Sequence, residues 1–185
     1  MKKEISVKQL ILNAAEEVTM EHGASNMTLN AVAKKAGISK GGLLYHFPSK
    51  DELIKGMISH MIEDQFEIMK NISEKLPETP SNKIKSHVLL WCHEPEKRKH
   101  FHAVIIAILS YNPEIIGPFK EIHSNLMKEF SKGMDPVMIK IISLASMGLM
   151  LSDVFNARLF TDKEQKEITD KLLELADKAI IKGEE

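Results

Sequence analysis

Apolar residues recur every three or four positions along most of this chain, and that spacing is typical of amphipathic helices. The first such stretch covers residues 6–22 and is followed by Gly23, a residue type that commonly ends helices. A second follows Thr28, whose hydroxyl suits an N-cap, and stops at Gly37. A third covers residues 40–47. The pattern predicts three N-terminal helices, of which the last two are short and are joined by a tight turn.

The boundary after the third helix is set by Pro48. Proline disfavours helical geometry in the residue before it, so we expect Phe47 to leave the helix. Ser49 and Glu52 then have the spacing of a capping box, in which each side chain pairs with the other residue's backbone. This predicts a fourth, linking helix over about residues 50–72.

Further helices are predicted beyond a linker at 76–81, which contains two prolines and has no periodicity. Segments 83–93 and 95–110 each have helical spacing. Pro118 is expected to open another helix, because proline suits the first helical position, and Gly133 to end it. The remainder of the chain is therefore helical as well.

The segment 137–155 is apolar almost all round, interrupted mainly by Lys140 and Asp153. A helix of this kind must be buried on two sides. We interpret one side as core and the other as a contact with a second copy of the chain. A last helix, opened by a capping box at 161–164, completes a predicted four-helix dimer interface. The predicted interface residues are Ile141, Ala145, Gly148, Leu149, Ser152, Leu172, Leu175, Ala176 and Ala179.

Glycines in the third helix point to a function. Gly41 and Gly42 lie in its first turn, where each costs about 1 kcal/mol relative to alanine. Close approach of the backbone to a DNA phosphate would explain them, and a flexible loop is the alternative. The helix would span about 12 Å, a length suited to the major groove.

Side chains of the same helix divide into an inner and an outer set. Leu43 and Phe47 are expected in the core, which leaves Lys40, Tyr45 and His46 pointing toward DNA. A partly buried aromatic ring and a surface imidazole are the alternative for the last two. The natural phosphate partner next to this helix is Lys50, at the start of the linking helix.

Charge and composition add modest support. The net charge is -1, yet residues 1–55 carry eight lysines against six acidic residues. A hydrophobic fraction of 43% and a charged fraction of 28% are ordinary for a globular protein. The richest apolar stretch, residues 141–151, is too short to span a bilayer, and the single cysteine excludes an intrachain disulfide. We expect a cytoplasmic protein without a membrane segment.

The motif in residues 28–53 resembles the DNA-binding head of the TetR/AcrR family of bacterial transcription regulators. The resemblance is carried by Thr28, the run 33–41 and the run 44–53. It implies an all-helical homodimer that binds a palindromic double-stranded DNA operator, usually as a repressor released by a small molecule. By motif position it implies DNA contacts at Thr28, Ser39, Lys40, Gly41, Tyr45, His46 and Lys50.

One position departs from the family pattern. Many members have tyrosine where this chain has Leu44, and that tyrosine often contacts a phosphate. We therefore expect one such contact to be absent here, or to be supplied by Tyr45.

The expected fold class is all-α, with a three-helix helix-turn-helix head followed by a larger helical domain. The head covers residues 1–52, and the linking helix at 50–72 leads into an effector-binding and dimerisation domain at 53–185. An apolar or amphipathic effector is expected between helices of the larger domain. Its candidate lining residues are Met57, Met61, Trp91, Phe101, Ile105, Phe119, Ile122 and Phe155, which ordinary core packing would explain equally well.

Two other functions are alternatives for this chain. Cys92, His93, His100 and His102 carry groups that bind zinc or copper, so a metal-responsive sensor or a helical enzyme would use them. Their spacing contains neither a Cys-x-x-Cys nor a His-x-x-x-His pair, and we predict no metal, no cofactor and no catalytic residue. A protein-interaction adaptor that no longer binds DNA is the second alternative.

Overall fold

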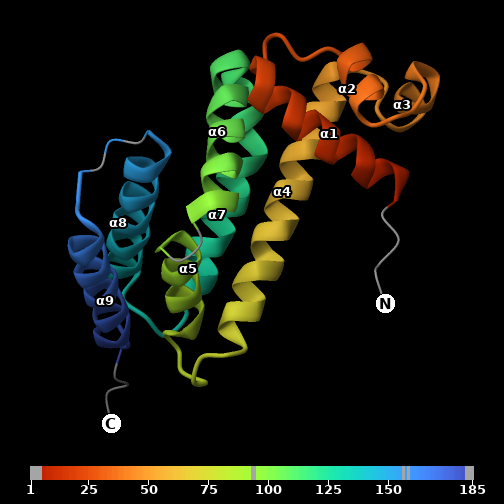
Figure 1. Cartoon of the computed structure of the whole chain (residues 1–185). Coiled ribbons are helices and arrows are strands. Elements are labelled where there is room, and N and C mark those ends of the chain that lie inside the picture. Colours follow the sequence, from red (N-terminus) through yellow and green to blue (C-terminus); the bar gives the residue numbers. More distant parts are fainter. Residues whose placement is uncertain (1–5, 93–94, 156, 158, 182–185) are drawn as a thin grey trace. The chain divides into compact units, whose positions relative to one another are not determined.

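The computed structural model describes residues 6–92, 95–155, 157 and 159–181, and in this part of the chain the regular structure is helical (Figure 1). This confirms the all-α fold class. The helices are α1 (Val7–His22), α2 (Leu29–Lys35), α3 (Lys40–His46), α4 (Lys50–Ser73), α5 (Asn82–Cys92), α6 (Pro95–Tyr111), the 3-10 turn η1 (Pro113–Ile115), α7 (Ile116–Phe130), α8 (Pro136–Val154) and α9 (Asp162–Lys178). In the described residues no helix is long and apolar enough to cross a membrane.

The helices form two compact units. The first contains Met1–Asp64 and His100–Ile116, and the second contains Gln65–Lys99 and Gly117–Glu185. Helices α4 and α6 each pass from one unit into the other. The division therefore differs from the boundary expected at residue 53, because the first part of α4 packs with the head.

The clearest reason for that packing is the contact between Phe47 and Gly56. Phe47 ends α3 with an extended backbone, as expected for a residue before proline, and its side chain is buried. A Cβ atom on Gly56 of α4 would lie 2.5 Å from Cε1 of the Phe47 ring. The ring thus packs against bare helix backbone. Leu43 of α3 and Leu53 and Ile54 of α4 are fully buried as well.

One helix start and one capping box differ from expectation. Helix α7 begins at Ile116, two residues before Pro118. The first four amides of a helix have no partner within it, so proline is tolerated throughout the first turn and does not mark the first residue. At the start of α4, Ser49 accepts the amide of Glu52 (3.1 Å), while the Glu52 carboxylate pairs with Lys55 (2.8 Å).

The second unit is built on α5, α8 and α9, which pack together around a buried apolar core. Hydrogen bonds connect the start of α5 with the end of α9. Asp177 near the end of α9 accepts hydrogen bonds from the Ser81 hydroxyl and from Lys85, both at 2.6 Å. The predicted capping box at the start of α9 is present, with Thr161 and Glu164 each pairing with the other's backbone.

Inside this unit lies a buried imidazole, His87. Its Nε2 is 3.2 Å from the Ser143 hydroxyl, and the indole N–H of Trp91 donates to its ring. Burial, with a smaller contribution from the charge of the nearby His123, lowers the pKa of His87 to about 3. The ring is therefore neutral at physiological pH and acts as part of the core.

The Phe47–Gly56 contact generates a stability prediction. Replacing Gly56 with alanine inserts a methyl group into the Phe47 ring, and we expect a loss of about 1 to 2 kcal/mol because overpacking outweighs the gain in helix propensity. Gly41→Ala is the matched control. The nearest atom to its new methyl is 4.0 Å away, so we expect a gain of up to about 1 kcal/mol. Thermal unfolding of both variants measures this, and a Gly56→Ala protein as stable as Gly41→Ala would contradict it.

A second prediction concerns pH. Burial, together with the charges of Asp64 and Glu17, raises the pKa of Glu16 in α1 from its usual 4.5 to about 7. The folded protein therefore holds a proton that the unfolded chain loses, and stability falls as pH rises from about 4.5 through 7. We expect Glu16→Gln to be more stable than wild type at pH 8, by about 1 kcal/mol after allowance for solvent screening, and nearly equal at pH 5.

The control for this experiment is Glu17→Gln. The Glu17 carboxylate pairs with Lys35 at 2.9 Å, so its removal offers no such gain. Denaturant unfolding at the two pH values is the measurement. An equal effect of Glu16→Gln at both would show that Glu16 does not titrate between them.

Candidate nucleic-acid interface

The turn between α2 and α3 has a well-defined cause in the sequence. Gly37 takes a left-handed backbone conformation with φ +70°, which side chains rarely tolerate. The amide of Ile38 donates to the Ala33 carbonyl (3.0 Å) and that of Gly37 to the Lys34 carbonyl (3.3 Å). This pair of bonds is the Schellman motif, which satisfies the last carbonyls of a helix. It ends α2 and redirects the chain within three residues.

The start of α3 follows at once. Ser39 is extended, and its hydroxyl accepts the amide of Gly42 at 3.0 Å, as expected for an N-cap. The hydroxyl of Thr28 caps α2 in the same way by accepting the amide of Ala31 at 3.1 Å. Both predicted caps are confirmed, and both residues remain exposed.

The two glycines of α3 have different surroundings. A methyl group on Gly42 would lie 3.3 Å from the Ser39 hydroxyl, so this position is crowded by the cap itself. Gly41 is exposed, and a methyl group there would meet only the same oxygen, at 4.0 Å. Packing within the described chain therefore does not require glycine at position 41. A partner molecule that comes close to the helix backbone at this position would require glycine there.

The outward face of α3 is confirmed by burial. Leu43 is fully buried, whereas Tyr45 is 86% exposed and Lys40 is exposed. His46 is half-buried, and its ring packs edge-on against Tyr45 with the centroids 5.2 Å apart. Tyr45 lies four residues after Gly41 and so shares its helix face, and the exposed Lys40 directly precedes that glycine.

Leu44, where many family members carry tyrosine, is half-buried between the core and that surface. An apolar side chain offers no hydrogen bond there. The neighbouring Tyr45 is exposed, and its hydroxyl can supply such a hydrogen bond.

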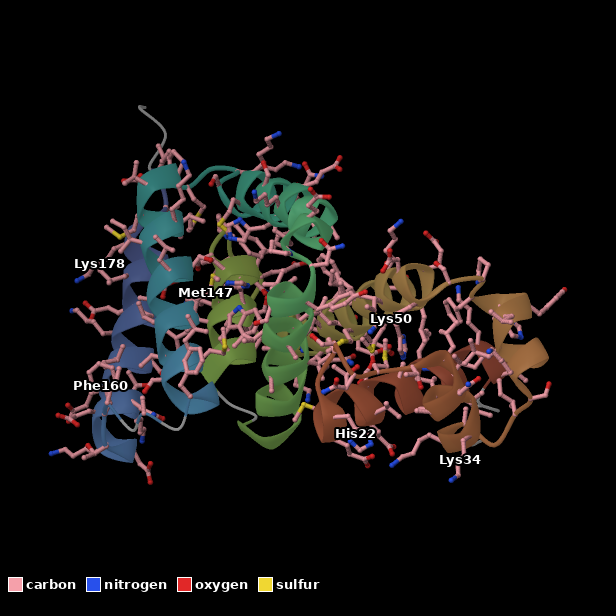
Figure 2. The ribbon with its side chains drawn as sticks, turned by 90° about the horizontal axis from the view of Figure 1, so that it is seen from above. His22, Lys34, Lys50, Met147, Phe160 and Lys178 are labelled. Carbon is pink, nitrogen blue, oxygen red and sulfur yellow. The ribbon has the colours of Figure 1, made fainter. Side chains whose placement is uncertain are left out.

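Lys50, the expected phosphate partner, has two contacts within its own chain. It is the first residue of α4 and is labelled in Figure 2. Its ammonium donates to the Ser25 carbonyl (2.9 Å) and lies 4.3 Å from the centre of the Tyr111 ring. Burial lowers the pKa of this amine, and the charge of Asp51 opposes that shift. Spacing along the chain offers no signal for either contact, because Ser25 and Tyr111 are both distant from Lys50 in sequence.

The candidate effector residues are divided between the two units. Met57 and Met61 are buried and Ile105 is half-buried in the first, while Trp91 and Ile122 are half-buried in the second. Phe155 is 64% exposed near the end of α8, so in this single chain it lines no interior. The side chains of Phe101 and Phe119 lie outside the described part of the structure.

The apolar helix α8 is indeed two-sided, but the sides differ from those predicted. Ile141 and Gly148 are exposed and Ala145 is half-buried, whereas Leu149 and Ser152 are buried within their own unit. On α9, Leu172, Ala176 and Ala179 are buried and Leu175 is half-buried. The buried residues belong to the core of one chain, which corrects that part of the predicted interface. The exposed apolar residues, which we call the α8 stripe, are Val137, Ile141, Leu144, Leu151 and Phe155.

The metal-binding alternative falls largely outside the described structure. His93 is outside it, as are the side chains of Cys92, His100 and His102. Among the residues that are described, no group of three His, Cys, Asp or Glu side chains is arranged to hold a metal ion.

Comparison with known families covers most of the chain. Residues 11–57 match the model described as bacterial regulatory proteins, tetR family. Residues 84–177 match the model described as tetracyclin repressor-like, C-terminal domain. The first match contains the whole helix-turn-helix, and the second runs from α5 into α9.

Curated relatives match mainly through the N-terminal part. The HTH-type transcriptional regulator SrpR of Pseudomonas putida is 36% identical over 62 residues, which are 32% of this chain and 29% of SrpR. The HTH-type transcriptional regulator UidR of Escherichia coli K12 is 30% identical over 118 residues, or 63% of this chain and 58% of UidR. The matches thus span less than two thirds of these relatives' own length.

Solved structures share the fold over almost the entire chain. A transcriptional regulator from Rhodococcus sp. Rha1 aligns with a TM-score of 0.73 at 15% identity, over 97% of this chain and all of its own. The multidrug binding protein EbrR, solved with malachite green, gives a TM-score of 0.67 at 16% identity, over 94% of this chain and 97% of its own. NalD, described as the secondary repressor of the MexAB-OprM efflux pump in Pseudomonas aeruginosa, gives 0.61 at 18%, over 96% and 97%. At these identities the likeness concerns the fold.

Proposed function

Because this chain belongs to the TetR family of bacterial regulatory proteins, we propose that it is a DNA-binding transcriptional repressor. It acts as a homodimer in the cytoplasm, binds a palindromic operator in double-stranded DNA, and is released by a small apolar or amphipathic effector. The observation that carries this proposal is the surface of α3, where Lys40 and Tyr45 are exposed beside a glycine that the chain's own packing does not require.

The chemistry of that surface suits DNA. The ammonium of Lys40 and the hydroxyl of Tyr45 both donate hydrogen bonds, to phosphate oxygens or to acceptors on base edges. The absence of a side chain at Gly41 lets the helix backbone come within contact distance of the nucleic acid. The core residues Leu43 and Phe47 hold the opposite face of the helix, so this surface is presented rigidly.

Dimerisation is supported by the α8 stripe. Its members are spaced four, three, seven and four residues apart, which places the first four along one face of α8, with Phe155 directly after the helix end. Leu144 is 67% exposed and Phe155 is 64% exposed, and contiguous apolar surface of this kind commonly marks an interface. A second copy, packing its own α8 against the stripe, is the occupant we propose, because a two-fold contact pairs the same surface on both chains.

Pairing also accounts for operator recognition. Dimeric readers insert two recognition helices about one DNA turn, or 34 Å, apart, so the spacing of the heads decides affinity. An effector that binds the conformation with one head spacing more tightly than the conformation with the other shifts the equilibrium between these two conformations. Couplings of about 1 to 3 kcal/mol would weaken operator binding about 5- to 150-fold.

Continuous helices can transmit a conformational change from the second unit to the head. α4 and α6 each begin in one unit and end in the other, so a change in the second unit has two covalent paths to the head. The descriptions of EbrR as a multidrug binding protein and of NalD as a repressor of an efflux pump support an apolar or amphipathic effector for this chain as well.

Two substitutions in α3 test the DNA-facing surface. Tyr45→Ala removes an exposed donor, and Gly41→Ala places a methyl group where DNA approaches. We expect each to weaken binding to the intergenic DNA upstream of the protein's own gene by about 5- to 150-fold, since one good contact is worth about 1 to 3 kcal/mol. Fluorescence anisotropy with a labelled duplex measures this.

The control is Lys163→Ala on α9, which truncates an exposed polar side chain in the other unit. We expect its affinity to equal that of wild type, and Gly41→Ala to bind weakly although it is the more stable protein. Unchanged affinity in both α3 variants would remove the assignment of this surface to DNA and favour a protein-interaction adaptor.

The dimer is tested at Leu144. Leu144→Asp places a charge in the middle of the α8 stripe without disturbing the core, because the side chain is largely exposed in the single chain. We expect the variant to sediment as a folded monomer and to lose operator binding, while wild type sediments as a dimer. Met20→Asp, at an exposed apolar position of α1, should remain dimeric. A monomeric wild type, or a dimeric Leu144→Asp, would contradict the interface.

A further inference from the structure

The position of Lys50 is unfavourable for the helix that it begins. A helix N-terminus carries partial positive charge and favours acidic side chains, which α4 supplies at Asp51 and Glu52. An ammonium at the first residue gains nothing from that field. Its contacts must come from elsewhere, and they do: the Ser25 carbonyl at 2.9 Å and the Tyr111 ring at 4.3 Å.

Tyr111 is fixed by its place on α6. It is the last residue of that helix, and it continues the face formed by Val104 and Ile108, both fully buried. The amide of Asn112 donates to the Ile108 carbonyl at 2.9 Å, so helical hydrogen bonding extends to the residue after Tyr111. The Tyr111 side chain is 37% exposed, and its ring lies under the Lys50 ammonium, which is attracted to the aromatic face.

All three partners belong to the first unit, but they come from separate elements. Ser25 lies between α1 and α2, Lys50 begins α4, and Tyr111 ends α6. Ser25 is also only three residues before Thr28, the N-cap of α2 that is assigned to the DNA-facing surface. The ammonium is therefore held by the segment that leads into α2 and by the C-terminal end of α6.

We propose that Tyr111 is a positioning residue for DNA binding: its ring holds the Lys50 ammonium where it meets a backbone phosphate. This rests on the proposed function, because it assumes that the head binds DNA. The lysine has three donors, of which the Ser25 carbonyl takes one, so the others remain for a phosphate. A displacement of α6 by an effector moves the ring and releases the lysine, which adds a direct path from α6 to the DNA contact.

The test compares wild type with Tyr111→Leu, Tyr111→Phe, Lys50→Met and the double variant Tyr111→Leu/Lys50→Met. Affinity for the upstream intergenic duplex is measured by anisotropy at several KCl concentrations. Tyr111→Leu removes the aromatic face, and we expect affinity to fall about 3- to 10-fold. The slope of log affinity against log salt should become shallower by about 0.9 for each phosphate that the variant no longer neutralises. Tyr111→Phe keeps the face and should bind like wild type.

The double variant separates positioning from a general structural effect. We expect it to bind no more weakly than Lys50→Met, because without the ammonium the ring has nothing to position. Wild-type affinity in Tyr111→Leu, or an equal loss from Tyr111→Leu in the presence and absence of Lys50, would overturn the role of Tyr111 while leaving DNA binding intact. A wild-type protein that binds no duplex at any salt concentration would overturn the proposed function, and this inference with it.

Discussion

The contact between the Phe47 ring and the bare backbone of α4 at Gly56 holds the recognition surface in place. Pro48 forces Phe47 into an extended conformation, and that conformation aims the ring at α4 instead of continuing α3. A helix of only seven residues has little stability of its own, so α3 depends on this packing for its orientation. Any reading of DNA by Lys40 or Tyr45 therefore depends on where α4 lies.

The same dependence explains how a regulator can be built from these units. Helix α4 carries Gly56 in the first unit and continues into the second, and α6 makes the opposite passage and ends at Tyr111. The head is thus attached to α4 through Phe47 and to α6 through the Lys50 ammonium. Neither attachment involves the exposed face of α3, which leaves that face free for nucleic acid.

Local rules predict the helix-turn-helix well, because its parts are short-range. Caps at Thr28 and Ser39, the left-handed Gly37 and the stop at Pro48 each act within a few residues. Which residues of α8 face the core and which face outward is harder to predict. An all-apolar helix has no polar face to orient it, so the pattern places Leu149 outward although it is buried, and it does not identify the exposed Leu144. The partners of Lys50 depend on tertiary contacts that no spacing along the chain encodes.

We infer above all that this chain is one half of a paired DNA reader. Repeated selection of bound duplexes from a random DNA library tests this most directly, because it assumes neither an operator nor an effector. We expect enrichment of an inverted repeat whose half-sites are separated by about one helical turn, or 10 base pairs, or a related spacing. Enrichment of no sequence, or of a single half-site without its inverted partner, would contradict it.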